Sequence, residues 1–110
     1  DVFSLEFRCE GEEVELPPEK KLVLFRITQE CLQNAIKHSK ASKIDLCLSF
    51  TPKQCQLSIV DDGIGFDYET AKNGNGITNL RTRSSLIQAK FEIRSSENSG
   101  TSVGITLPLV

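Results

Sequence analysis

The chain has 110 residues, of which 38% are hydrophobic and 25% charged, and its formal net charge at pH 7 is −2. This length suits one domain, and the mixed charges argue against wholesale disorder. The slightly acidic balance excludes a bulk attraction to nucleic acid or to an anionic membrane. No apolar run approaches the about 20 residues of a membrane span. The first residues, DVFSLEF, lack Met and a basic segment, so we expect no signal peptide but a domain of a longer protein.

Cysteine spacing argues against a metal site. The four cysteines are Cys9, Cys31, Cys47 and Cys55, no two of them form a CxxC pair, and His38 has no ligand spacing with them. We therefore expect reduced thiols, packed in the core of a protein from a reducing compartment.

The first part of the chain predicts a strand followed by a long helix. Apolar and polar residues alternate over residues 2–9, which predicts a half-buried strand, and residues 14–16 predict a short return strand. The pair Pro17-Pro18 then opens a helix. The helix is predicted from about Glu19 to about His38, and its apolar arc is expected to face the core.

Two further strands are predicted at about Lys43–Phe50 and Cys55–Asp61, with a hairpin turn at Thr51–Gln54. The apolar stripe of the second strand ends on Asp61, which shares the parity of the inward-facing residues. A buried carboxylate without a partner is costly, so Asp61 requires a hydrogen-bonding partner from the protein or from a ligand.

The last third predicts a second helix, from near Ile77 to about Gln88, and a closing hairpin of strands Phe91–Ser95 and Thr101–Leu109. The polar, glycine-rich segment Tyr68–Asn75 is expected to be mobile. The element order predicts an α+β fold. We expect a two-layer α/β sandwich, in which a mixed, mostly antiparallel sheet carries its helices on one face.

One candidate site lies on the first helix. Glu30 and Asn34 are one turn apart and Lys37 follows, so we expect all three to project together. An amide oxygen suits Mg²⁺, a lysine can neutralise phosphate, and a carboxylate can orient a nucleophile. Taken alone, the same pattern also fits a solvated helix face.

Three glycine-containing segments are further candidates: Asp61–Phe66, Gly74–Gly76 and Gly100-Thr101. Glycine allows a close approach of backbone to a ligand or a positive φ, and amides at a helix start bind anions. Each segment alone also fits an ordinary turn or cap. The sequence contains neither GxxxxGK[ST] nor GxGxxG, which excludes a P-loop and a Rossmann fingerprint.

Four motifs in order carry a resemblance that covers about residues 2–110. ITQECLQNAIKHSKAS resembles the N box of histidine kinases, VDDGIGF the G1 box, GNGITNL the G2 box and GTSVGITLPL the closing strand. Together they resemble the ATP-binding domain of the GHKL superfamily, which includes the ATPase component of DNA gyrase, MutL, the Bergerat-fold chaperones and histidine kinases. The NAxKH form, the short lid and GITNLRTR are similar to the nitrate-sensor and DesK-type kinases. The resemblance implies one ATP-binding catalytic domain, residues 1–110, with the Bergerat sandwich.

The resemblance also implies roles for the residues of the N box. Asn34 would coordinate Mg²⁺, Glu30 would orient or deprotonate the attacking group, and Lys37 would meet phosphate oxygens. His38 occupies a position where related kinases carry an aromatic side chain beside the nucleotide.

The other motifs would hold the base and shape the lid. By resemblance, Asp61 accepts a hydrogen bond from the adenine amino group and Thr101 shares that site. The glycines expected to shape the pocket and lid are Gly63, Gly65, Gly74 and Gly76. Two departures from the family pattern are Ile77 in place of leucine and the missing acid in Arg81-Thr-Arg-Ser, which puts the lid-anchoring contacts in doubt.

The implied function is that of the catalytic domain of a two-component sensor histidine kinase. With ATP and Mg²⁺, it would transfer the γ-phosphoryl group to a histidine on a separate dimerisation domain, because no acceptor H box occurs in this chain. The implied partners are that domain and a response regulator, with no nucleic acid. We expect this cytoplasmic domain to be monomeric alone and homodimeric in the full-length protein, whose membrane attachment the sequence leaves open. Two alternatives are an anti-sigma-factor serine kinase and a non-catalytic ATP-binding switch.

Overall fold

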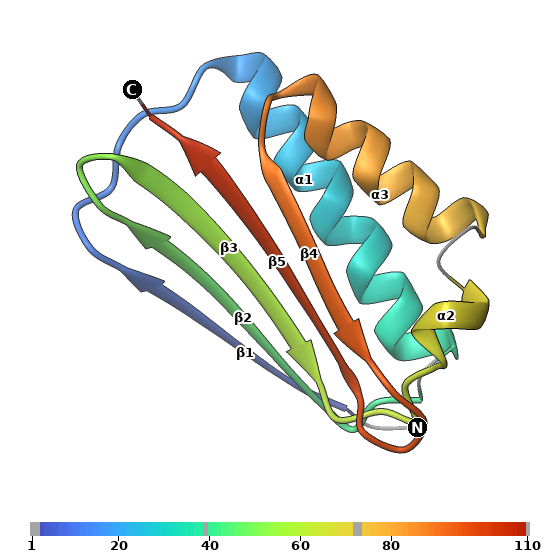
Figure 1. Ribbon diagram of the computed structural model, residues 1–110. Coiled ribbons are helices and arrows are strands. Elements are labelled where there is room, and N and C mark those ends of the chain that lie inside the picture. Colours follow the sequence, from blue (N-terminus) through green and yellow to red (C-terminus); the bar gives the residue numbers. More distant parts are fainter. Residues whose placement is uncertain (1–2, 39, 72–73, 110) are drawn as a thin grey trace.

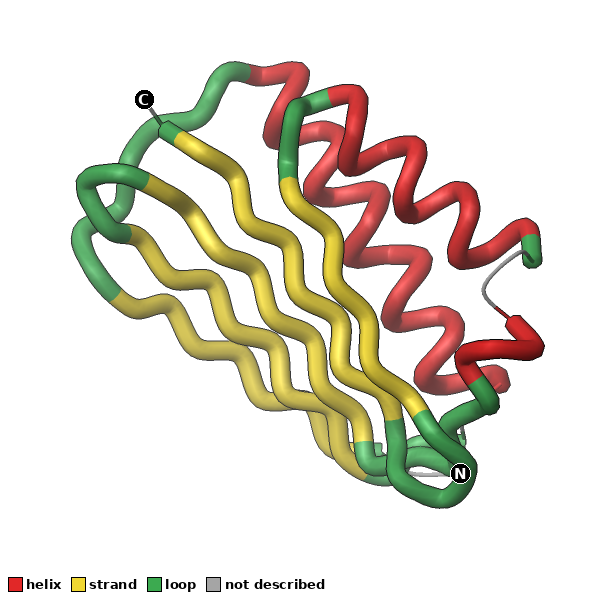
Figure 2. The backbone as a smooth tube through the Cα atoms, in the orientation of Figure 1, coloured by secondary structure: helices red, strands yellow, loops and turns green. Residues whose placement is uncertain are grey.

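The computed structural model describes residues 3–38, 40–71 and 74–109, and for residues 38, 68, 70 and 75 it describes the backbone alone. The strands form one twisted layer and the helices a second (Figure 1, Figure 2). This arrangement confirms the two-layer α/β sandwich. The elements are β1 (Ser4–Glu10), α1 (Pro18–Gln33), a π-helical segment (Asn34–His38), β2 (Lys43–Phe50), β3 (Gln54–Asp61), α2 (Tyr68–Ala71), α3 (Asn75–Leu86), β4 (Lys90–Ser95) and β5 (Thr101–Pro108).

The five strands lie in the order β1-β2-β3-β5-β4. β1 is parallel to β2, and the other three pairs are antiparallel, so the sheet is mixed and mostly antiparallel, as predicted. In the register of β3 and β5, Asp61 pairs with Thr101. The last residue of one strand and the first of the next therefore meet at one end of the sheet.

Alternate residues of the central strands form the core. In β3 and β5 the buried apolar side chains are Cys55, Leu57, Ile59, Val103, Ile105 and Leu107. The stripe of β3 continues onto Asp61, whose exposed fraction is only 9%. The structure therefore confirms that a carboxylate ends an apolar stripe.

The long helix begins as predicted, with Pro18 in its first turn, where the missing N–H of proline costs no hydrogen bond. The helical path continues through the π-helical segment to His38. α3 starts two residues before the predicted position of Ile77. The segment expected to be mobile contains the short helix α2, while its residues 72–73 lie outside the described residues.

The first strand corrects an expectation, because none of its residues is buried. Leu5 and Phe7 pair with Ile44 and Leu46 and so share their core-facing side, yet the exposed fractions of Leu5 and Phe7 are 47% and 59%. The helices lie toward the β4 side and leave this edge strand uncovered (Figure 1). Alternation shows that one face of a strand is apolar, but not that anything covers it.

The predicted return strand is also wrong. Residues 12–17 adopt no regular structure, because the chain turns at Gly11 and crosses the end of β2. Gly11 has φ +84°, and a Cβ there would lie 2.1 Å from the carbonyl oxygen of Phe50. Only glycine fits this crossing.

The cysteines are all free thiols, but they are not all core residues. Cys31 and Cys55 are buried, Cys47 is half-buried and Cys9 is exposed on the edge strand. Burial raises the pKa of Cys31 to about 12, so this thiol is neutral at physiological pH. Within the described residues, the structure contains no helix long and apolar enough to cross a membrane.

Candidate functional site

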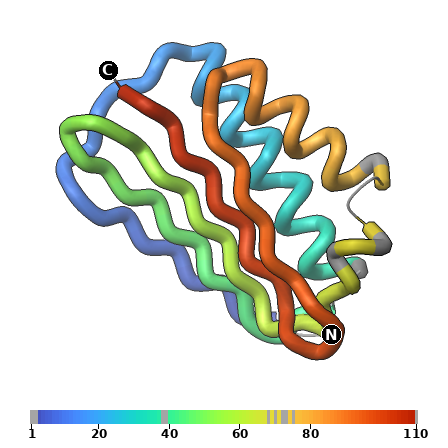
Figure 3. The backbone as a smooth tube through the Cα atoms, viewed as in Figure 1, coloured from blue at the N-terminus to red at the C-terminus, as the bar shows by residue number. Residues whose placement is uncertain are grey.

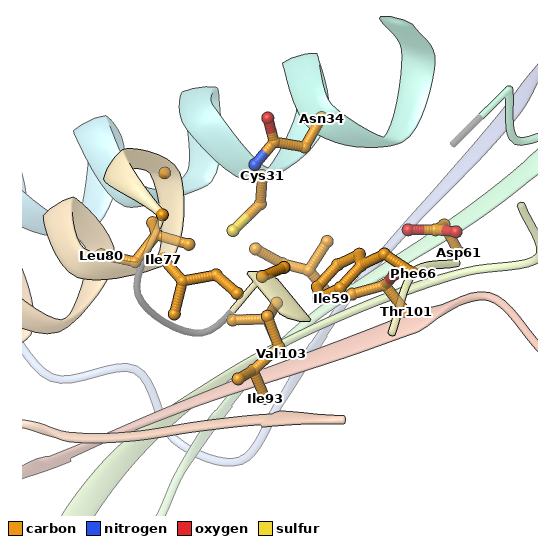
Figure 4. A pocket seen from close by; sticks show the side chains of 13 residues that line it. Cys31, Asn34, Ile59, Asp61, Phe66, Ile77, Leu80, Ile93, Thr101 and Val103 are labelled. Carbon is orange, nitrogen blue, oxygen red and sulfur yellow. The ribbon is translucent and has the colours of Figure 1, made fainter. Parts of the chain in front are cut away.

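A cavity of about 290 Å³ lies between the helix layer and the end of the sheet where β3 stops and β5 starts. The residues that line it come from segments far apart in the sequence: the end of α1 and the π-helical segment, the end of β3 and the loop after it, α2, the start of α3 and both strands of the closing hairpin. The backbone of these segments comes together at one end of the fold (Figure 3). The apolar wall is formed by Cys31, Ile59, Phe66, Ala71, Ile77, Leu80, Ile93 and Val103. The side chains of Asn34, Asp61 and Thr101 add the polar atoms (Figure 4).

Asp61 and Thr101 form the polar end of this cavity (Figure 4). Asp61 is the last residue of β3. Its Oδ1 accepts a hydrogen bond from the backbone N–H of Gly63 at 2.8 Å. Burial raises the pKa of Asp61, and backbone hydrogen bonds from Gly63 and Thr101 partly oppose this effect. The partner that the sequence required for this carboxylate is thus the backbone around it, which holds an acceptor oxygen beside the apolar wall.

Asn34 stands at the opposite side, where α1 passes into the π-helical segment (Figure 4). π-helical turns occur mostly as single turns, frequently at functional sites. The amide of Asn34 contributes to the cavity wall, whereas Lys37 is exposed. The side chain of His38 lies outside the described residues.

Glu30 precedes Asn34 by one α-helical turn, since the backbone N–H of Asn34 donates to the carbonyl of Glu30. Its Oε2 forms a partly buried ion pair with Nη1 of Arg83 on α3, and Glu30 is not among the residues that line the cavity. Of the three residues expected to project together, only Asn34 lines the cavity. Lys37 follows Asn34 within the π-helical segment, where the α-helical spacing on which its expected position depended no longer holds.

The predicted glycines occupy the cavity rim and the adjoining loop. Gly74 and Gly76 line the cavity at the start of α3, and Gly63 donates to Asp61. Gly65 has φ +66°, and a Cβ there would lie 2.2 Å from the carbonyl oxygen of Ser96. The loop after β3 therefore packs directly on the β4–β5 turn.

The sequence motifs gave no role to Asp62. Its side chain holds the end of β3, at one side of the site, to the start of β2. Its Oδ1 accepts from the backbone N–H groups of Ser42 and Lys43, at 2.9 and 2.8 Å, and its Oδ2 accepts from Ser42 Oγ at 2.8 Å. These hydrogen bonds hold the pKa of Asp62 below its usual range. The carboxylate thus joins the end of β3 to the start of β2. A pair of adjacent aspartates in the sequence does not reveal that one faces the cavity and the other the neighbouring strand.

Replacing Asp62 with Asn is expected to lower the melting temperature at neutral pH by a few degrees. A carboxylate with a depressed pKa stabilises the fold above its unfolded-state pKa, and this stabilisation is lost as pH falls through the lower folded-state pKa. Thermal unfolding of both proteins between pH 7 and pH 3 tests this. The difference in melting temperature should shrink toward acid pH, and a difference independent of pH contradicts the role of the charge.

The oxygen donors at the cavity suit a metal ion that is coordinated mainly by water and by the phosphates of a bound molecule. Among the described residues, no group of three or more His, Cys, Asp or Glu side chains could hold a metal ion. The amide of Asn34 at the cavity is a single hard oxygen donor. Such a donor suits Mg²⁺, which keeps several waters and binds one or two protein groups together with phosphates.

The arrangement suits a flat heteroaromatic ligand with a polar tail. The apolar wall can cover the faces of a ring, while Asp61 and Thr101 present oxygen atoms to its edge. Gly74 and Gly76 line the cavity at the start of α3, where backbone N–H groups favour an anion.

Comparisons with known proteins identify a family, similar sequences and a similar fold. Residues 19–110 match the family of histidine kinase-, DNA gyrase B- and HSP90-like ATPases. The signal transduction histidine-protein kinase/phosphatase DegS of Brevibacillus brevis is 31% identical over 106 residues, which cover 96% of this chain and 28% of DegS. The sensor histidine kinase LiaS of Bacillus subtilis strain 168 is 37% identical over 87 residues, which cover 78% of this chain and 24% of LiaS.

The chain thus spans about a quarter of the length of these relatives. Among solved structures, the histidine kinase domain of the blue-light activated histidine kinase EL346 of Erythrobacter litoralis superposes with a TM-score of 0.77 at 21% identity. The match covers 96% of this chain and 52% of that domain, so the two share the fold.

Proposed function

The chain belongs to the family of histidine kinase-, DNA gyrase B- and HSP90-like ATPases, and from this premise we propose that its cavity binds ATP for phosphoryl transfer to a histidine. The observation that carries the proposal is the convergence of Asn34, Asp61 and Thr101 on one apolar cavity. These residues come from three separate sequence motifs, and each lies on a different element. A turn or a solvated helix face would not require them to meet.

In this proposal the polar end of the cavity, at Asp61 and Thr101, holds adenine. Asp61 accepts a hydrogen bond from the 6-amino group, and Thr101 contributes its hydroxyl beside it. The apolar wall covers the faces of the ring. Gly63 and Gly65 shape the loop under the base, and Gly74 and Gly76 shape the lid side of the pocket.

Adenine selectivity gives a direct test of the assignment. ATP is expected to bind more tightly than GTP, because Asp61 faces a donor in adenine and an acceptor in guanine. A polar mismatch of this kind costs roughly 1–3 kcal/mol. Titration calorimetry with both nucleotides measures the difference, and Asp61→Asn should weaken ATP binding and reduce the preference. Equal affinities of the wild-type protein for ATP and GTP would contradict the role of Asp61.

The phosphates would extend toward Asn34 and the start of α3. Mg²⁺ bound to Asn34 and to phosphate oxygens would neutralise charge on the phosphates. Lys37, exposed on the π-helical segment, would meet phosphate oxygens, and His38 would lie beside the nucleotide. These assignments follow the family motifs, and the position of Asn34 supports the first of them.

The reaction forms a bond between an imidazole nitrogen of the acceptor histidine and the γ-phosphorus. The bond from that phosphorus to the bridging oxygen breaks, and ADP leaves. Catalysis of such a transfer is mostly positioning and electrostatic stabilisation. Glu30 would orient or deprotonate the attacking imidazole. For this role its carboxylate, which is paired with Arg83, would meet the imidazole at the edge of the cavity.

The partners would be the dimerisation domain that carries the acceptor histidine and a response regulator that receives the phosphoryl group. The relatives are named as histidine kinases, which supports this choice over a serine kinase or a non-catalytic switch. We further propose a cytoplasmic domain within a homodimeric kinase. Transfer of label from γ-labelled ATP to an added acceptor domain tests the function as a whole.

A further inference from the structure

Ser95, the last residue of β4, forms three hydrogen bonds at the polar end of the cavity. Its Oγ lies 2.9 Å from the backbone nitrogen of Phe66, 3.0 Å from the carbonyl oxygen of Gly100 and 2.9 Å from Oγ1 of Thr101. The hydroxyl thus joins the loop after β3 to the β4–β5 turn. No sequence motif singles out this serine.

Counting donors and acceptors fixes the direction of each bond. A serine hydroxyl has one hydrogen to donate and two lone pairs to accept. The carbonyl of Gly100 can only accept, so it takes the hydrogen of Ser95. The N–H of Phe66 can only donate, so it uses one lone pair. The remaining lone pair of Ser95 must accept from the hydroxyl of Thr101.

Thr101 therefore donates its only hydroxyl hydrogen to Ser95. Toward the cavity, which it lines beside Asp61 (Figure 4), its oxygen presents lone pairs alone. Asp61 pairs with Thr101 across the strands, and its Oδ1, which accepts the N–H of Gly63, is also a hydrogen-bond acceptor. The polar end of the cavity thus offers hydrogen-bond acceptors from both side chains and no hydroxyl donor from Thr101.

We infer that Ser95 is a specificity-determining residue, which excludes 6-oxopurine nucleotides by holding the Thr101 hydroxyl as an acceptor. The inference rests on the proposed function, in which Asp61 and Thr101 face the base. The 6-amino group of adenine carries two hydrogens and suits two acceptors. The 6-oxo group of hypoxanthine is itself an acceptor and meets no donor there.

Asp61 alone would leave this selection incomplete, because a carboxylate can also accept from N1–H of hypoxanthine. The fixed hydroxyl of Thr101 opposes the oxo group directly. Without Ser95, the hydroxyl of Thr101 is able to rotate and donate to that oxo group. Removal of the serine hydroxyl should therefore change the ratio of two affinities and not merely weaken both.

The test compares ATP with ITP, whose base is hypoxanthine, by titration calorimetry. The wild-type protein should prefer ATP, and Ser95→Ala should lower the ratio of the two affinities about fivefold, which is the effect of one hydrogen bond. Ser95→Thr keeps a hydroxyl and should retain the preference. Ser102→Ala, on the neighbouring residue of Thr101 in β5, serves as the matched control and should leave the ratio unchanged.

A double-mutant cycle isolates the contact between Ser95 and Thr101. In a Thr101→Val background, Ser95→Ala should no longer change the ratio, because no hydroxyl remains to rotate. Thr101→Val alone should also lower the preference for ATP, which supplies a second variant if Ser95→Ala folds poorly. Circular dichroism reports the folding of each variant.

The outcomes separate this inference from the proposed function. If wild-type protein prefers ATP and Ser95→Ala weakens both nucleotides by the same factor, Ser95 has a structural role only and the inference is overturned. If wild-type protein binds neither nucleotide, or both equally, the proposed recognition of adenine by Asp61 and Thr101 is wrong. The inference about Ser95 is then wrong as well.

Discussion

Replacing Asn34 with Ala is expected to abolish the tightening of ATP binding by Mg²⁺ while the protein remains folded. Asn34 lies at the cavity where α1 ends, and its amide is the proposed protein ligand of the metal. Loss of groups that merely support a metal ligand lowers metal affinity about 10–100-fold, so loss of the ligand itself should cost at least about tenfold. The side chain is only half-buried, and its removal leaves no large cavity in the core.

Titration calorimetry of ATP with Mg²⁺ and with a chelator, on both proteins, measures this effect. Asn79→Ala is the matched control, since Asn79 is an exposed asparagine on α3 and does not line the cavity. It should keep the full response to Mg²⁺. If the wild-type protein binds ATP with the same affinity in both buffers, the metal role of Asn34 is wrong.

The sheet and its buried carboxylate could be predicted from the sequence, because the alternation of apolar and polar residues is a local signal. Side chains of a strand point to opposite faces with a period of two, so the parity of Cys55 and Leu57 determines the parity of Asp61. The hairpin turn then sets the register of β2 and β3, with Phe50 opposite Cys55. A short connection leaves few other pairings.

The contacts that complete the site could not be predicted from such a local pattern. Glu30 and Arg83 are 53 residues apart, and their meeting depends on how α3 packs against α1. The bonds of Ser95 depend likewise on where two turns come together. Such contacts have no period in the sequence. The exposure of β1 could not be predicted for the same reason, because the pattern of a strand does not specify where the helices lie.

The chain on its own is expected to bind ATP without phosphorylating itself. Its only histidine, His38, belongs to the N-box segment and would contribute to the nucleotide site. The acceptor must approach the γ-phosphorus roughly in line with the bond that breaks, from outside that site. Incubation with γ-labelled ATP should leave no acid-labile label on the chain. Label retained as phosphohistidine by the chain alone would overturn this expectation.

Addition of the proposed dimerisation domain that bears the acceptor histidine should restore transfer. Glu30→Ala should then lower the transfer rate by about 10²-fold or more, as expected for a lost acid–base group, and change ATP affinity far less. Because Glu30 also pairs with Arg83, Arg83→Gln is the matched control: it breaks the ion pair and keeps the carboxylate. A rate loss in Arg83→Gln as large as that in Glu30→Ala would assign the effect to the packing of α3 on α1. A much smaller loss in Arg83→Gln would assign it to the carboxylate of Glu30, acting on the imidazole that attacks the phosphorus.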